Sequence, residues 1–154
     1  MKKFTNHVDH VAWISRPETL NANVAELEKL TGAKLVRFER KDMGFVMCID
    51  WEAGLEVVSP MREPTDFNKG LYEWLETRGE GVISVVFGVR DLEKHKARLE
   101  GLGVPVGPLM DDHPDSPWHD KINLLERAAG IVMNSTLILG DIDYSDSMIQ
   151  FGLA

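Results

Sequence analysis

Two side chains able to transfer a proton stand in strand-like, mainly apolar stretches of the first half of the chain. His10 lies in VDHVAWIS, residues 8–15, and Glu56 lies in GLEVVSP, residues 54–60. Burying a carboxylate costs free energy unless it is paired or bound to a metal ion, so Glu56 is expected to have a partner. His10 on its own would be interpreted as a core histidine, because that is the commoner situation for an isolated histidine.

A second group of reactive side chains occurs in MDDHPDSPWHD, residues 110–120, which contains His113, Trp118 and His119. Its two prolines and several turn-forming residues are typical of a loop. Three interpretations remain open: a solvated acidic loop, a lid in which these three residues contact a substrate, and a loop whose histidine reaches a metal ion.

The elements that must position these residues repeat along the chain. Apolar residues at helical spacing follow residues 8–15 and end at Thr31-Gly32, and the strands AKLVRFER, GFVMCID and GLEVVSP come next. The same order returns in GVISVVFGV, a helix that ends at GLG, and then VPVGPLM, KINLLE and GIVMNSTLIL. We therefore expect one domain of two βαβββ units, at about residues 5–60 and 80–141, joined by a helix at about residues 65–78.

This paired order resembles the vicinal oxygen chelate superfamily, which has the glyoxalase, bleomycin resistance and extradiol dioxygenase fold. The resemblance covers nearly the whole chain and is strongest to the methylmalonyl-CoA epimerase-like branch, through VDHVAW, GLEVVSP and LYEWLETRGEGV. The most specific part is RGEG leading into VISVVFGVRDLE. The resemblance implies an α+β fold in which two units form a shared half-barrel cleft, with metal ligands on the first and last strand of each unit.

The resemblance also assigns the four ligand positions. It places His10 and Glu56 in the first unit, on neighbouring strands, where they could hold Zn, Mn, Co, Ni or Fe. In the second unit it places Ser84 where a histidine is usual and Asn134 where a glutamate is usual. A hydroxyl is a poor transition-metal ligand, and an amide oxygen suits harder ions. We therefore predict a weak and incomplete metal site at His10 and Glu56, or none, with Ser84 and Asn134 in the substrate cleft.

Three functions are consistent with this resemblance. The first is a glyoxalase-like epimerase, isomerase or lyase, in which His10 and Glu56 act on a small oxygenated substrate with or without a divalent metal. The second is a metal-free binding or resistance protein that holds an antibiotic or another aromatic molecule between aromatic side chains. The candidates for this surface are Trp13, Trp51, Trp118, Phe45 and Phe87, of which Trp13 and Phe87 lie out of phase with His10 and Ser84. The third is an extradiol-type dioxygenase, which would need a second histidine where the chain has Ser84.

The composition limits the partners. The chain has 154 residues and a net charge of -8 without a Lys/Arg cluster, so nucleic acid and anionic membranes are poor candidates. No apolar run approaches the roughly 20 residues of a membrane span, and the start lacks the apolar region of a secretory signal. We expect a cytoplasmic homodimer with Cys48, the only cysteine, as a buried thiol. Alternating Ile149, Phe151 and Leu153 predict a tail that docks on an edge or a partner chain, or is loose.

Overall fold

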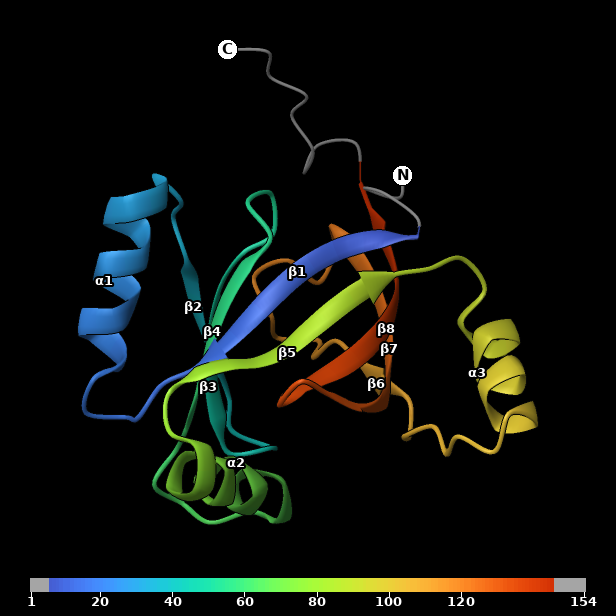
Figure 1. Ribbon diagram of the computed structural model, residues 1–154. Coiled ribbons are helices and arrows are strands. Elements are labelled where there is room, and N and C mark those ends of the chain that lie inside the picture. The colour runs from blue at the N-terminus through green and yellow to red at the C-terminus, as the bar shows by residue number, and fades with distance from the viewer. Residues whose placement is uncertain (1–5, 146–154) are drawn as a thin grey trace. The chain divides into compact units, whose positions relative to one another are not determined.

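The computed structural model describes residues 6–145 (Figure 1), so the alternating tail at residues 149–153 lies outside the described residues. The chain forms two compact units. The N-terminal unit comprises residues 10–83, and the described part of the C-terminal unit comprises residues 84–145 together with residues 6–9. Both boundaries fall inside strands, β1 (His7–Ile14) and β5 (Gly81–Gly88). None of the helices in the described range is long and apolar enough to span a membrane.

The N-terminal unit is built on a four-stranded mixed sheet with the strand order β2-β3-β4-β1. Strand β3 is antiparallel to both of its neighbours, whereas β4 and β1 are parallel. The other elements of this unit are α1 (Leu20–Thr31), β2 (Val36–Arg40), β3 (Phe45–Asp50), β4 (Leu55–Pro60) and α2 (Asp66–Arg78). Helix α2 coincides with the linking helix that the sequence predicts.

Different helices cover the two faces of this sheet (Figure 1). On one face α1 packs on β3 and β4, in a buried cluster of Leu20, Val46, Cys48 and Val57. On the other face α2 packs on β1, β3 and β4, in a buried cluster of Ile14, Phe45, Val58, Leu71 and Leu75. Because side chains alternate along a strand, Glu56 shares the α2 face with Val58, while Cys48 lies on the α1 face.

Asn68 fixes the start of α2 to the β3–β4 part of the sheet. Thr65 and Asn68 form a capping box at the helix N-terminus. The Asn68 amide nitrogen also donates to the backbone oxygens of Gly44, Met61 and Glu63 at 2.9, 3.2 and 2.7 Å. Gly44 has a φ of 76°, and a Cβ there would lie 2.5 Å from the same nitrogen, so this close approach requires glycine.

Glu80 ties the connection between α2 and β5 to the region where α1 begins. Its Oε2 accepts hydrogen bonds from Ser15 Oγ at 2.9 Å, the Arg16 backbone N–H at 2.9 Å, Thr19 Oγ1 at 2.6 Å and Asn23 Nδ2 at 2.9 Å. These hydrogen bonds, first of all that from Thr19, hold the pKa of Glu80 below its ordinary value. The RGEG motif thus contributes a carboxylate that fastens two segments of the N-terminal unit together.

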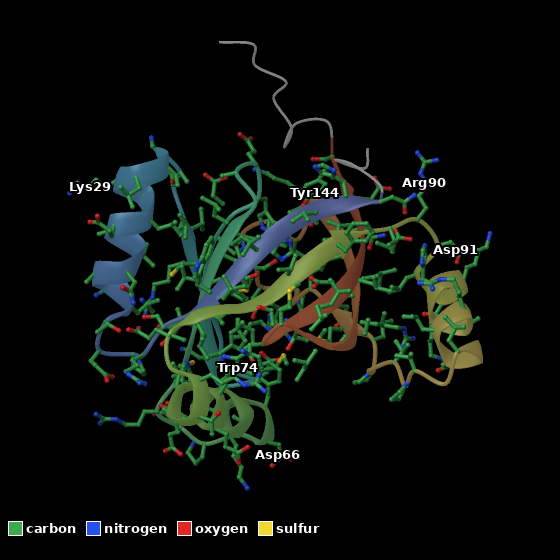
Figure 2. The ribbon with its side chains drawn as sticks, viewed as in Figure 1. Lys29, Asp66, Trp74, Arg90, Asp91 and Tyr144 are labelled. Carbon is green, nitrogen blue, oxygen red and sulfur yellow. The ribbon has the colours of Figure 1, made fainter. Side chains whose placement is uncertain are left out.

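The C-terminal unit has the strand order β5-β8-β7-β6, with β5 and β8 parallel and the other neighbours antiparallel. Its other elements are α3 (Leu92–Gly101), β6 (Met110–Asp111), β7 (Ile122–Val132) and β8 (Ser135–Tyr144). Helix α3 begins at Asp91 (Figure 2), whose Oδ1 accepts a hydrogen bond from the Lys94 backbone N–H at 3.1 Å. The helix packs through a buried cluster of Val89, Leu92 and Leu139.

Two strand predictions in the C-terminal unit are wrong. Of VPVGPLM, residues 104–110, only Met110 belongs to a strand, since the two prolines of this segment have no N–H to donate to a ladder. GIVMNSTLIL, residues 130–139, is not one strand. It ends β7, reverses at Met133 and Asn134 and begins β8. Both turn residues have positive φ, 48° and 61°, which is the conformation of a tight two-residue hairpin turn.

Candidate functional site

His10 and Glu56 lie together in the N-terminal unit. Strands β1 and β4 are parallel, with Ala12 opposite Glu56. His10 is two residues before Ala12, so its side chain faces the same side of the sheet. His10 Nε2 lies 3.3 Å from Glu56 Oε2. The two side chains that the sequence singles out are therefore in contact, whereas their chemical roles stay predictions.

This histidine–carboxylate pair is buried beside an indole ring. His10 is 3% exposed, Glu56 8% and Trp51 5%. The rings of His10 and Trp51 meet edge to face, with centroids 5.2 Å apart and an angle of 75° between the planes. Electrostatic attraction between buried groups is stronger than in water, so this setting favours a well-oriented imidazole–carboxylate contact.

Asp50 fixes the turn between β3 and β4 from which Trp51 projects. One carboxylate oxygen of Asp50 accepts a hydrogen bond from the Ala53 backbone N–H at 3.0 Å, and the other accepts from the Lys34 backbone N–H at 2.9 Å. The Gly54 N–H donates to the Asp50 carbonyl at 2.9 Å. The sequence shows Trp51 only as an aromatic residue of a turn; its contact with His10 depends on this turn geometry.

The strand registers show which residues of the C-terminal unit match the pair. Along β1, buried and half-buried residues alternate from His10 onward. Along β5, the same alternation begins at Ser84. Ser84 therefore matches His10, as the resemblance implies. Ser84 is buried, with 8% of its surface exposed.

The residue that matches Glu56 is Ile138. Ala12, two residues after His10, is opposite Glu56, and Val86, two residues after Ser84, is opposite Ile138. The last strand of the C-terminal unit thus has an aliphatic side chain where the N-terminal unit has a carboxylate.

Asn134 does not occupy the strand position predicted for it. It is the second residue of the turn between β7 and β8, and it is exposed. The prediction treats residues 130–139 as a single strand, whereas Met133 and Asn134 reverse the chain before β8 begins. An asparagine tolerates the left-handed conformation of such a turn, which accounts for the residue type at this position.

Asp112 organises the loop at residues 110–120. Its carboxylate accepts hydrogen bonds from Ser116 Oγ at 2.6 Å and Trp118 Nε1 at 3.2 Å, and it lies 3.3 Å from His119 Nδ1. Trp118 is only 4% exposed. Its indole therefore belongs to the core of the loop in this structure, rather than forming an exposed surface for a substrate.

The two histidines of this loop have different surroundings. His113 Nδ1 accepts a hydrogen bond from the Asp115 backbone N–H at 3.1 Å. His119 lines a pocket of about 620 Å³ in the C-terminal unit, together with Asp112 and Tyr144. Within residues 6–145, no three His, Cys, Asp or Glu side chains are placed to hold a metal ion, so neither loop histidine belongs to such a cluster.

His10 and Glu56 by themselves do not fit a tightly bound transition metal. They offer one imidazole nitrogen and one carboxylate, whereas catalytic zinc sites usually have three protein ligands. At the matching positions of the C-terminal unit, Ser84 has only a weak hydroxyl donor and Ile138 has no donor atom. No chemical step is therefore assigned to a metal ion at these positions.

No family model and no curated protein matches the chain. Among solved structures, methylmalonyl-CoA epimerase from Mycobacterium tuberculosis has a TM-score of 0.65 at 17% identity, over 92% of each chain. A methylmalonyl-CoA epimerase in complex with methylmalonyl-CoA and NH4+ has a TM-score of 0.60 at 18% identity, over 96% of this chain and 99% of that chain. A hypothetical protein from Bacillus halodurans has a TM-score of 0.64 at 15% identity, over 90% and 95%. These likenesses confirm the glyoxalase-like α+β fold predicted from the sequence.

Proposed function

We propose that this chain is a glyoxalase-like isomerase in which Glu56, oriented by His10, moves a proton at a carbon next to a carbonyl group. The observation that carries the proposal is the 3.3 Å contact between these two buried groups on neighbouring strands. Structural neighbours include methylmalonyl-CoA epimerases. An acyl thioester is therefore the substrate class that we propose first.

Glu56 is assigned the role of the base. Its side chain is 11% exposed against 3% for His10, so a substrate reaches the carboxylate before the imidazole. His10 Nε2 lies 3.3 Å from Glu56 Oε2, and we assign His10 the role of a positioning residue that fixes the direction of the carboxylate. General-base catalysis requires this kind of fixed geometry between the base and the proton that it removes.

The proposed step conserves atoms and charge. Glu56 accepts the proton of the α-carbon, and the electron pair of the broken C–H bond moves into the carbonyl group to give an enolate. Glu56, now a carboxylic acid, returns a proton to the α-carbon. If the carboxylic acid first exchanges its proton with solvent, return to the same face gives isotope exchange without inversion. Epimerisation requires that the opposite face of the enolate be protonated, either by a second acid such as solvent water or after the enolate turns over beside Glu56. Exchange and inversion can therefore be measured separately, and both begin with proton removal by Glu56.

The test is deuterium exchange in D2O with a single epimer of methylmalonyl-CoA, followed by NMR, with inversion followed by chiral separation. We expect Glu56→Gln to lower the exchange rate by about 10²–10⁴-fold, the usual contribution of a general base. His10→Ala should also lower the exchange rate, because the carboxylate loses the side chain that orients it. His7→Ala is the matched control, because His7 lies exposed on the same strand. Exchange that Glu56→Gln leaves unchanged would refute the assignment, and no exchange with any of a set of α-substituted acyl thioesters would refute the proposed activity.

A metal-free binding protein is the second candidate, favoured by the replacement of two ligand positions by Ser84 and Ile138. Saturable binding of a planar aromatic ligand by calorimetry, weakened by Trp51→Ala and without exchange of any thioester, would support it. An extradiol dioxygenase is less well supported, since position 84 lacks the second histidine that such an enzyme needs. The homodimer and the cytoplasmic location stay predictions.

A further inference from the structure

A pocket of about 560 Å³ opens between α1 and the sheet of the N-terminal unit, next to the edge strand β2. Its volume falls within the range of roughly 300–1,000 Å³ that is usual for small-molecule sites. The apolar part of its wall consists of Val24, Ala25, Ala33, Leu35 and Cys48. This open pocket therefore offers an apolar wall against which an acyl chain can pack.

The charged residues that line this pocket are mainly basic. Lys29, Lys34 and Arg37 line it, against a single carboxylate from Glu28. The whole chain has 17 basic and 25 acidic residues, so the wall of this pocket reverses the overall balance of charge. Figure 2 shows Lys29 on α1. Such a wall attracts an anion in spite of the negative charge of the protein.

The basic side chains make only weak ion pairs. Lys29 Nζ lies 3.8 Å from Glu26, and the Arg37 guanidinium lies 3.6 Å from Glu39, with the two basic side chains 75% and 49% exposed. Exposed pairs of this kind contribute little, so a ligand carboxylate can replace them. Arg37 is also opposite Cys48 in the β2–β3 register, which directs both side chains to the α1 face.

We propose that this pocket, which we call the α1 pocket, binds a medium-chain carboxylic acid, with its acyl chain on the apolar wall and its carboxylate at Lys34 and Arg37. Removal of the acyl chain of the ligand from water contributes to the free energy of binding. Arginine pairs with a carboxylate through two parallel hydrogen bonds, which favours this head group over a neutral one. A cationic amphiphile of the same length can pack on the same apolar wall, but its head group is repelled by Lys34 and Arg37.

The α1 pocket is separate from the histidine–carboxylate pair. Cys48 lies on the α1 face of the sheet, with Val57, whereas Glu56 lies on the α2 face, with Val58. Binding at the α1 pocket therefore does not depend on the proposed isomerase activity. A ligand seated there contacts α1 and the edge of the sheet and leaves the face that carries His10 free.

Cys48 provides a reporter for this site, because it is the only cysteine of the chain and lines the pocket. Burial raises the pKa of its thiol, so its modification by a disulfide reagent in the free protein is slow but specific to one position. Decanoate is the probe, and acetate and decyltrimethylammonium are the controls for chain and charge. We expect decanoate to bind with 1:1 stoichiometry in calorimetry and to slow the modification of Cys48 by about tenfold or more, and neither control to do so.

Charge-reversal variants locate the head group. Lys34→Glu with Arg37→Glu should weaken decanoate binding by at least about tenfold, because each attraction becomes a repulsion. Lys69→Glu, at an exposed position on α2, is the matched control and should leave binding unchanged. Circular dichroism confirms that each variant is folded. The proposal is overturned by absence of decanoate binding below its micelle concentration, by equal binding of decyltrimethylammonium, by binding that leaves Cys48 unprotected, or by binding that the double variant retains.

Discussion

Replacing Tyr144 by Phe removes one hydroxyl group from the interior of the C-terminal unit (Figure 2). That hydroxyl lies 2.8 and 3.0 Å from the two carboxylate oxygens of Asp9 and donates to this carboxylate. Asp9 is 6% exposed and Tyr144 is 2% exposed. The substitution keeps the aromatic ring and its packing, so its effect on stability reports the loss of the donor to a buried carboxylate.

At neutral pH the expected loss is about 1.5–3 kcal/mol in the free energy of unfolding, the range for a hydrogen bond to a charged group. Tyr72→Phe is the matched control. The Tyr72 hydroxyl donates to the Met61 carbonyl at 3.0 Å, and loss of such a neutral bond should cost only about 0.5–1.5 kcal/mol.

Alkaline pH adds a second, independent consequence. Burial is the main reason why the pKa of Tyr144 lies far above its ordinary value of 10.0, and the neighbouring Asp9 carboxylate raises it further. The folded protein therefore keeps a proton that the unfolded chain releases, so this contribution to stability is complete below pH 10 and declines above it. One proton corresponds to about 1.36 kcal/mol per pH unit, which amounts to about 1 kcal/mol between pH 10 and 11 once partial ionisation is included.

The assay is denaturant unfolding followed by circular dichroism at pH 7, 10 and 11. We expect the unaltered protein to lose about 1 kcal/mol more than Tyr144→Phe between pH 10 and 11, since all other titrating groups cancel in the difference. Ultraviolet titration of the folded protein should show that Tyr144 forms no phenolate in this pH range, since its pKa is raised far above the ordinary value. Equal losses in both proteins, or a cost at pH 7 no larger than that of Tyr72→Phe, would refute the reasoning.

Two further substitutions test other parts of the fold. Glu80→Gln should lower the melting temperature at pH 7, because the amide accepts the four hydrogen bonds at Glu80 Oε2 less well than a carboxylate does. Since the pKa of Glu80 is lowered in the folded state, this difference should begin to shrink near the ordinary glutamate pKa of about 4.3 and vanish only as the pH falls through the lower pKa of the folded state. Scanning calorimetry with Glu76→Gln as the control measures it, and a difference that persists in acid would contradict the assignment. Met133→Asn combined with Asn134→Gly should raise stability by about 0.5–1 kcal/mol, because both turn residues have positive φ. An unchanged denaturation midpoint would show that the turn is not strained.

The fold could be predicted because local pattern and spacing agree over long stretches. The resemblance places Ser84 at the position that matches His10, and the burial alternation that β1 and β5 share agrees with that match. The contact between His10 and Glu56 came from the resemblance, since no local pattern relates residues 46 positions apart. The fold is therefore better determined by the sequence than the chemistry at its centre.

The strand and site predictions are wrong where the residues of a turn carry no sequence signal for that turn. Met133 carries no turn signal, so residues 130–139 read as one apolar strand, and Asn134 received a position that belongs to Ile138. Glu80 belongs to a recognisable RGEG motif, yet its role depends on donors from residues 15–23 that only the folded chain brings to it. Trp51 is a similar case, because its contact with His10 is set by a turn and not by a periodic pattern.

The boundary inside β1 has a consequence for dissecting the chain into fragments. Adjacent residues of this strand serve different units, since Asp9 bonds to Tyr144 of the C-terminal unit while His10 belongs to the N-terminal unit. Asn6 likewise donates its backbone N–H to the Gly88 carbonyl at 2.6 Å. A cut before α2 would therefore leave the C-terminal fragment without residues that its own sheet uses. A circular permutant that restores residues 6–9 to that fragment is the form in which the C-terminal unit could be studied alone.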